Sequence, residues 1–295
     1  MSADFWAGYV SGAVGIIVGN PLDIVKLRQQ TQYAEGTVAV FQNTRSLLAG
    51  TAGPLLGYGA LNALLFVSYN RTESALNRAF ATEKSLSINW VAGAVGGLAT
   101  WVVSAPTELV KCRAQIALPT AKSSFSIAKD IWHKGGIRGL YFGGLVTALR
   151  DSIGYGFYFW SYEIAIRNWP LSEQRRGFSL KDEAPRVMLC GGLAGIVTWA
   201  SVFPLDVIKT RLQTRTALQK FVTAEENVVL TRKSAWLIAK HMFREEGMKP
   251  FFRGLTVCSI RAFIVNAAQW AVYEGLMYNS GEGRFRNDEV MEHTQ

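Results

Sequence analysis

The chain has 295 residues, of which 49% are apolar and 18% are charged, and its mean hydropathy is +0.13. This balance argues against an ordinary soluble domain and indicates that lipid surrounds much of the chain. The net charge of +9 does not indicate a nucleic-acid partner, because the basic residues lie between and at the ends of long apolar stretches.

The cysteines and the N-terminus predict no disulfide framework and no cleaved leader. Cys112, Cys190 and Cys258 are widely separated and odd in number, so we expect small buried side chains rather than a disulfide or metal site. The first residues lack the basic region and cleavage site of a secretory signal and are not an Arg-rich, acid-poor transit helix. Targeting information is therefore expected within the mature segments.

A ten-residue pattern occurs three times in the chain. It reads PLDIVKLRQQ from Pro21, PTELVKCRAQ from Pro106 and PLDVIKTRLQ from Pro204, so the copies begin 85 and 98 residues apart. Each copy has the form P-x-D/E-x-x-K-x-R-x-Q. The recurrence predicts three repeats and a polar tail, which cover residues 1–84, 85–180, 181–280 and 281–295.

Six apolar stretches are long enough to cross a hydrocarbon core, which needs about 20 residues. In chain order they cover residues 4–30, 54–78, 88–115, 143–168, 185–213 and 254–279. An even number of spans places both ends of the chain on one side of the membrane.

The segments between the spans are more polar. Apolar residues recur at helical spacing in 124–134 and 234–247, which predicts helices lying at the membrane surface. The polar stretch 171–184 is interpreted as an exposed loop. Glycines gather in the first, third and fifth spans, where they let helix backbones approach closely in lipid.

The threefold pattern, together with EGMKPFFRG at 246–254, resembles the mitochondrial carrier family over essentially the full chain. The family's acidic-Gly-x4-aromatic-basic-Gly element is complete in the third repeat. The second copy, GGIRGLYFG from Gly135, lacks the acidic and basic residues, and the first, AGTAGPLLG from Ala49, keeps mainly glycines.

This resemblance implies the fold class. It implies an all-α membrane protein with six transmembrane helices in a threefold pseudosymmetric bundle around a cavity, and three short matrix-side surface helices. Helices are required because lipid leaves no other way to satisfy the backbone. The resemblance also implies the mitochondrial inner membrane, with both termini on the intermembrane-space side, although peroxisomal membranes house some members.

The repeated motif predicts a gate at one end of the bundle. Pro21, Pro106 and Pro204 are expected to bend three helices inward, and the charges that follow them are costly at membrane depth unless paired. The resemblance implies three ion pairs on the matrix side, namely Asp23 with Lys111, Glu108 with Lys209, and Asp206 with Lys26. It also implies that Gln30, Gln115 and Gln213 hydrogen-bond across these pairs, and we call the nine residues the matrix gate.

An alternative is that these charges merely anchor helix ends at the interface. The fixed order of acid before base argues against it, because anchoring does not require acids.

The opposite gate of the family, F/Y-D/E-x-x-K/R on the even-numbered helices, is degraded. The predicted cytoplasmic gate consists of Tyr69, Tyr162, Glu163, Tyr273 and Glu274. Without basic partners, it is expected to close through aromatic and apolar contacts. Arg167 lies one residue off register, which places it about 100° from the expected helix face.

Three ionisable residues are expected near mid-membrane on the even-numbered helices, where charge usually serves function. Arg150 and Arg261 each precede the Glu of a Tyr-Glu pair by 13 residues, and they match the second and third substrate-contact positions of the family. Arginine can grip a carboxylate through two hydrogen bonds, and Asp151 can neutralise a cationic group. The set predicts a site for an amino-acid-like zwitterion. Alternatively, Arg150 and Asp151 satisfy one another as a buried pair.

The first even-numbered helix offers Gly57 and Tyr58 at the corresponding depth, and no acid, which disfavours lysine or arginine as the solute. Tyr58 is expected to contact the solute, and so is Asn20, which stands where the carnitine branch commonly has histidine. Aromatic side chains available for cation–π contact are Tyr58, Tyr155, Tyr158, Trp160 and Trp270.

The Arg-Asp pair and RAFIVNAAQWAVYE from Arg261 resemble the carnitine/acylcarnitine and ornithine branch. The expected function is transport of a zwitterion by alternating access, with carnitine or its acyl esters favoured. Alternatives are a basic or methylated amino acid or choline, and a carrier-like scaffold that no longer transports. Expected partners are the solute and inner-membrane lipid, including cardiolipin, with the chain a monomer.

Nothing in the sequence indicates catalysis. His133, His241 and His293 stand apart, and the HExxH, G-x-S-x-G and P-loop patterns are missing. No metal or organic cofactor is expected.

Overall fold

The structure is a computed structural model that describes residues 3–31, 51–81, 85–116, 123–169, 180–218 and 235–279. Within these ranges it is helical, without strands. Six long helices are present: α1 (Ala3–Thr31), α4 (Ala52–Phe80), α5 (Leu86–Ile116), α7 (Gly144–Arg167), α8 (Leu180–Leu218) and α11 (Leu255–Asn279). The shorter elements are α6 (Ser124–Leu140), α10 (Ala235–Glu246) and the 3-10 helix η2 (Lys249–Phe252).

Five stretches of the described chain are long and apolar enough to cross a membrane, at Trp6–Thr31, Ala52–Phe80, Leu86–Gln115, Met188–Thr214 and Lys249–Tyr273, of which the last begins in η2 and continues through α11. The other long helix, α7, has 24 residues, but Arg150 and Asp151 lower its hydropathy. It packs between α5 and α8. The predicted span 143–168 is therefore a membrane-length helix whose polar residues turn away from lipid.

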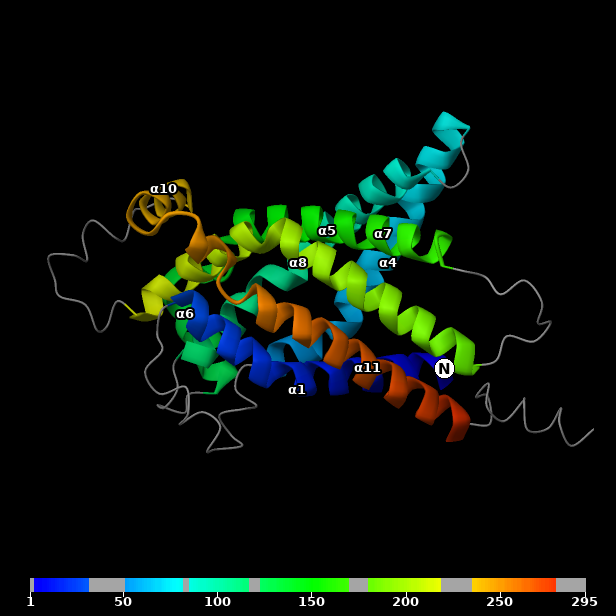
Figure 1. Ribbon diagram of the computed structural model, residues 1–295. Coiled ribbons are helices and arrows are strands. Elements are labelled where there is room, and N and C mark those ends of the chain that lie inside the picture. The colour runs from blue at the N-terminus through cyan, green and yellow to red at the C-terminus, as the bar shows by residue number, and fades with distance from the viewer. Residues whose placement is uncertain are drawn as a thin grey trace, which may run out of the picture.

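The six long helices form a ring in chain order (Figure 1). Each packs against the next, and α11 returns to contact α1. The surface helices α6 and α10 lie at one end of the bundle, against α5 and α8, while the N-terminal end of α1 and the C-terminal end of α11 lie at the other. This arrangement confirms the predicted all-α bundle. The surface helix expected in the first repeat, residues 171–179 of the predicted loop and the 281–295 tail lie outside the described residues. The prediction of a loop over 180–184 is wrong, because α8 begins at Leu180 and extends the apolar span by helical turns.

Proline lies inside a helix at each predicted position. Pro21 lies in α1, Pro106 in α5 and Pro204 in α8, and each helix continues for at least two further turns. Those turns carry the charged residues of the motif. The inward bend expected at the prolines stays a prediction.

Close backbone contact holds α7 at a defined depth against α5. A methyl carbon at Gly97 of α5 would lie 2.3 Å from the backbone oxygen of Asp151, and one at Gly93 would lie 2.6 Å from that of Tyr155. Only glycine allows helices to approach this closely. The contact therefore positions Arg150 and Asp151 along the bundle axis.

Candidate functional site

A cavity of about 460 Å³ lies inside the helix ring. Its wall is built from one stretch each of α1, α5, α7, α8 and α11, and among the described residues none from α4 lines it. The volume is in the range that suits a small molecule. The residues on the wall include Arg150, Asp151 and Arg261, as the sequence predicts for a solute site.

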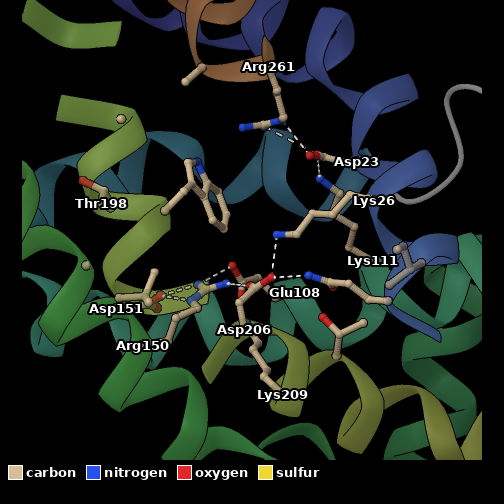
Figure 2. A pocket seen from close by; sticks show the side chains of 18 of the residues that line it. Asp23, Lys26, Glu108, Lys111, Arg150, Asp151, Thr198, Asp206, Lys209 and Arg261 are labelled. Carbon is tan, nitrogen blue, oxygen red and sulfur yellow. Dashed lines mark hydrogen bonds and ion pairs between the residues drawn. The ribbon is translucent and has the colours of Figure 1, made fainter. Parts of the chain in front are cut away.

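The six charged residues of the matrix gate form the three expected ion pairs across helices. The Nζ of Lys111 lies 2.5 Å from Oδ2 of Asp23, and the Nζ of Lys26 lies 2.6 Å from Oδ2 of Asp206. Glu108 pairs with Lys209. Each pair joins two repeats, and all six residues lie on the wall of the cavity (Figure 2).

The two cavity arginines bind the carboxylates that the three lysines of the matrix gate also bind. Arg261 Nε lies 2.6 Å from Oδ1 of Asp23. Arg150 donates from Nη2 to Glu108 Oε1 at 2.7 Å and from Nη1 to Asp206 Oδ1 at 3.3 Å. Each gate acid therefore faces both a lysine and an arginine.

Asp151 is engaged on both carboxylate oxygens. Its Oδ1 accepts from Arg150 Nε at 2.8 Å, and its Oδ2 accepts from the hydroxyl of Ser104 at 2.7 Å. The Asp151 side chain is 5% exposed. This geometry is the buried pair that the sequence left open as an alternative, and a direct contact of Asp151 with solute stays a prediction.

The other two predicted solute contacts do not line the cavity. Tyr58 lies against Gly12 of α1, and its ring centroid is 6.5 Å from that of Tyr9. Asn20 is fully buried and accepts a hydrogen bond from Gln115 Nε2 at 3.0 Å. Tyr58 thus packs α4 against α1, and Asn20 links α1 to α5.

The three glutamines of the matrix gate have different surroundings. Gln30 donates to Asp206 Oδ2 at 2.9 Å and so reinforces the pair with Lys26. Gln115 binds Asn20 instead of an ion pair. Gln213 is fully buried, and neither atom of its amide has a hydrogen-bond partner among the described residues. In this conformation only Gln30 makes the contact that the sequence predicts.

Substituting leucine at Gln30 and at Gln213 should give opposite results. Gln30→Leu removes a hydrogen bond to a charged acceptor, worth about 1.5–3 kcal/mol, and should lower the thermal unfolding midpoint by several degrees. Gln213→Leu removes an unpartnered buried amide and should leave the midpoint unchanged or raise it. Thermal unfolding of the two purified variants without solute tests this pair, and equal losses would contradict it.

Aromatic contacts gather toward the opposite end. Tyr69 of α4 stacks on Phe159 of α7, with ring centroids 4.2 Å apart. Tyr162 stacks on Tyr158 at 6.1 Å within α7. Arg167 pairs with Glu163, one turn away on the same helix, at 2.8 Å, so this ion pair links no two helices. Tyr273 lies near the end of α11, and the Glu274 side chain lies outside the described residues.

Sequence reasoning missed three wall residues. Thr198 and Trp199 lie on α8, and Asn266 lies on α11. The Nζ of Lys26 lies 3.9 Å from the centroid of the Trp199 ring, a cation–π contact. A signal was present, because Trp199 precedes Asp206 by seven residues. Two helical turns place both residues on one face.

The sequence pattern of the family described as mitochondrial carrier protein matches residues 1–80, 82–171 and 181–279. The chain belongs to the mitochondrial carrier family. Members of this family are transporters rather than enzymes, so this chain is a transporter.

Relatives of the carrier include transporters of different solutes. A mitochondrial basic amino acids transporter of Mus musculus is 35% identical over 96% of this chain and 91% of its own length. A mitochondrial arginine transporter of Arabidopsis thaliana is 33% identical over 92% of this chain and 89% of its own. A mitochondrial carnitine carrier of Saccharomyces cerevisiae is 32% identical, over 90% and 83%.

Proposed function

We propose that this carrier moves a cationic amino acid, such as lysine, arginine or ornithine, across the mitochondrial inner membrane. The similarity to basic amino acid transporters over nearly the full chain supports this choice. The sequence alone favoured carnitine and gave a basic amino acid as an alternative. The proposal reverses that order. Carnitine stays the second candidate because of the yeast carnitine carrier.

Within the structure, an excess of positive charge at Asp23 supports the carboxylate end of this solute, while the choice of a cationic side chain rests on the relatives. Five cations and four acids line the cavity, and both Lys111 and Arg261 bind Asp23. One carboxylate cannot neutralise two cations. Arg261 can therefore offer its guanidinium group to the carboxylate of an amino acid, a bidentate partner that arginine prefers.

The cationic end of the solute can meet several wall residues. Tyr155, Tyr158 and Trp199 line the cavity and have ring faces that attract a cation. The sequence disfavoured lysine and arginine because the first even-numbered helix has no acid. In the folded chain the acids on the wall come from α1, α5, α7 and α8, and all of them are paired with lysine or arginine. The cationic end is therefore proposed to lie against the aromatic ring faces rather than against an acid of α4.

Transport is proposed to proceed by alternating access. With the ion pairs of the matrix gate formed, solute enters from the opposite end, and its binding energy offsets the cost of opening the pairs. We assign the surface-helix end to the matrix and both termini to the intermembrane space. One chain completes the helix ring, which supports a monomer, surrounded by inner-membrane lipid including cardiolipin.

Reconstituted liposomes test the solute. Liposomes that contain the carrier are preloaded with lysine, arginine, ornithine, carnitine or choline, and uptake of each radiolabelled compound is measured. Arg138→Gln, at an exposed arginine of α6 outside the cavity, serves as the control variant. The proposal predicts that lysine, arginine or ornithine exchanges at least about tenfold faster than carnitine.

Other outcomes would move the assignment. Faster carnitine exchange would make the carnitine carrier the better relative. Uptake of choline alone would show that the site does not recognise a solute carboxylate. Failure of every compound with a folded protein would favour the scaffold alternative.

A further inference from the structure

Each acid of the matrix gate is bound by its lysine and also by an arginine, either Arg150 of α7 or Arg261 of α11. We propose that Arg150 and Arg261, here named the latch arginines, are part of the matrix gate and are released from it by the solute. The release step rests on the proposed function, because it requires a solute with a carboxylate. The latch itself requires no solute.

Arg150 joins the second repeat to the third. It extends from α7 and binds Glu108 of α5 and Asp206 of α8. Its side chain is 14% exposed and that of Asp206 is 4% exposed. Glu108 is already paired with Lys209 and Asp206 with Lys26, so one guanidinium group ties two ion pairs together. Figure 2 shows the dashed lines from Arg150 reaching the carboxylates labelled Glu108 and Asp206.

Arg261 performs the matching role between the third repeat and the first. It extends from α11 to Asp23 of α1, with 2.6 Å between Nε and Oδ1. Figure 2 shows it reaching the gate from the side opposite to Arg150. The two latch arginines therefore close two of the three junctions between repeats.

The junction between the first and second repeats differs. At the corresponding depth α4 carries Gly57 and Tyr58, neither of which can bind a carboxylate as a cation. The direct ion pair across this junction is Asp23 with Lys111. We therefore infer an asymmetric gate, in which this junction opens without displacement of an arginine of its own.

The position of Arg150 is set by the fold and not by the solute. Asp151 holds its Nε at 2.8 Å and is itself held by the hydroxyl of Ser104 at 2.7 Å. The close contact at Gly97 keeps this part of α7 against α5. Ser104 and Asp151 thus act as positioning residues that aim the guanidinium group at Glu108 and Asp206.

These contacts give a route from solute binding to gate opening. A solute carboxylate competes with Asp23, Glu108 and Asp206 for the latch arginines, since all are carboxylates. When an arginine leaves, the acid keeps its lysine but loses its second cation. The gate is therefore weakened when solute is bound and stays doubly held when the cavity is empty.

A double-mutant cycle without solute tests the latch. Arg150→Gln, Asp206→Asn and the double variant are purified, and the thermal unfolding midpoint of each is measured, with Arg138→Gln as control. We expect Arg150→Gln to lower the midpoint by roughly 5 °C or more, and the double variant to lose clearly less than the sum of the single losses. The control should stay within about 1 °C of the parent.

An additive cycle, or an unchanged midpoint in Arg150→Gln, would overturn the latch. If Arg150→Gln does not fold, Arg150→Lys is used in the same cycle, because lysine keeps the charge but cannot span two acids. It should retain part of the coupling, and full retention would also overturn the proposal.

This experiment separates the latch from the identity of the solute. A non-additive cycle with no uptake of cationic amino acids would retain the latch and reject the proposed solute. For the release step, the double-mutant cycle is repeated with saturating solute, because its coupling term cancels the stabilisation that the solute gives to any chain that still has Arg150. The coupling between Arg150 and Asp206 should fall by at least half, and an unchanged coupling with a transported solute would reject release.

Discussion

Arg261→Ala is expected to reduce uptake of the transported amino acid by about 100-fold. Removing one partner of a buried, hydrogen-bonded charge pair typically costs 2–5 kcal/mol, and 1.4 kcal/mol corresponds to tenfold. The variant should still insert and fold, because Asp23 keeps its ion pair with Lys111 at 2.5 Å. Uptake into liposomes at matched protein content is the measurement.

Two further variants make the Arg261 result specific. Arg261→Lys keeps the charge without the two-pronged guanidinium group and should fall between the parent and alanine. Arg138→Gln should transport at the parental rate. Unreduced uptake in Arg261→Ala would show that the solute carboxylate is not read at this position, and the charge excess at Asp23 would lose its proposed role.

The second large effect is expected at Lys209. Its side chain is 3% exposed and pairs with Glu108. Lys209→Met should lower the thermal unfolding midpoint by on the order of 10 °C, because breaking one partner of a buried ion pair is strongly destabilising. Lys134→Met, at an exposed lysine of α6, is the control and should leave the midpoint unchanged.

A double variant separates stability from gating at this pair. Glu108→Gln with Lys209→Met removes both charges, so part of the lost midpoint should return, since neutral replacement of a buried pair is often tolerated. Exchange should nevertheless stay at least about tenfold below the parent, because this junction can no longer close by an ion pair. Exchange at the parental rate would show that Glu108 and Lys209 are structural and not part of a gate.

The latch also changes how the motif charges are understood. The sequence presents the lysines and acids of the motif as one set and the mid-membrane arginines as another. In the folded chain Arg150 and Arg261 reach the acids of the motif, so the solute site and the gate share their carboxylates. A substitution at either arginine is therefore expected to affect both solute binding and the stability of the closed gate.

Much of the architecture could be predicted from the sequence because it depends on local patterns. Apolar length located the helices, as in α4 and α5, which begin and end within two residues of the predicted spans. Repetition of proline, acid and lysine at fixed spacing revealed three equivalent charged segments, and the resemblance to the family implied the partners of Asp23, Glu108 and Asp206. The threefold repeat made that resemblance recognisable from the sequence.

Only the tertiary structure decided which other side chains reach the cavity. Tyr58 and Asn20 pack between helices, Asp151 turns to Ser104, and Trp199 lines the wall. Helical periodicity gives the face of a residue on its own helix, but not the rotation of that helix against its neighbours or the direction of a long side chain. Those depend on close contacts such as the one at Gly97, where two distant segments of the chain meet.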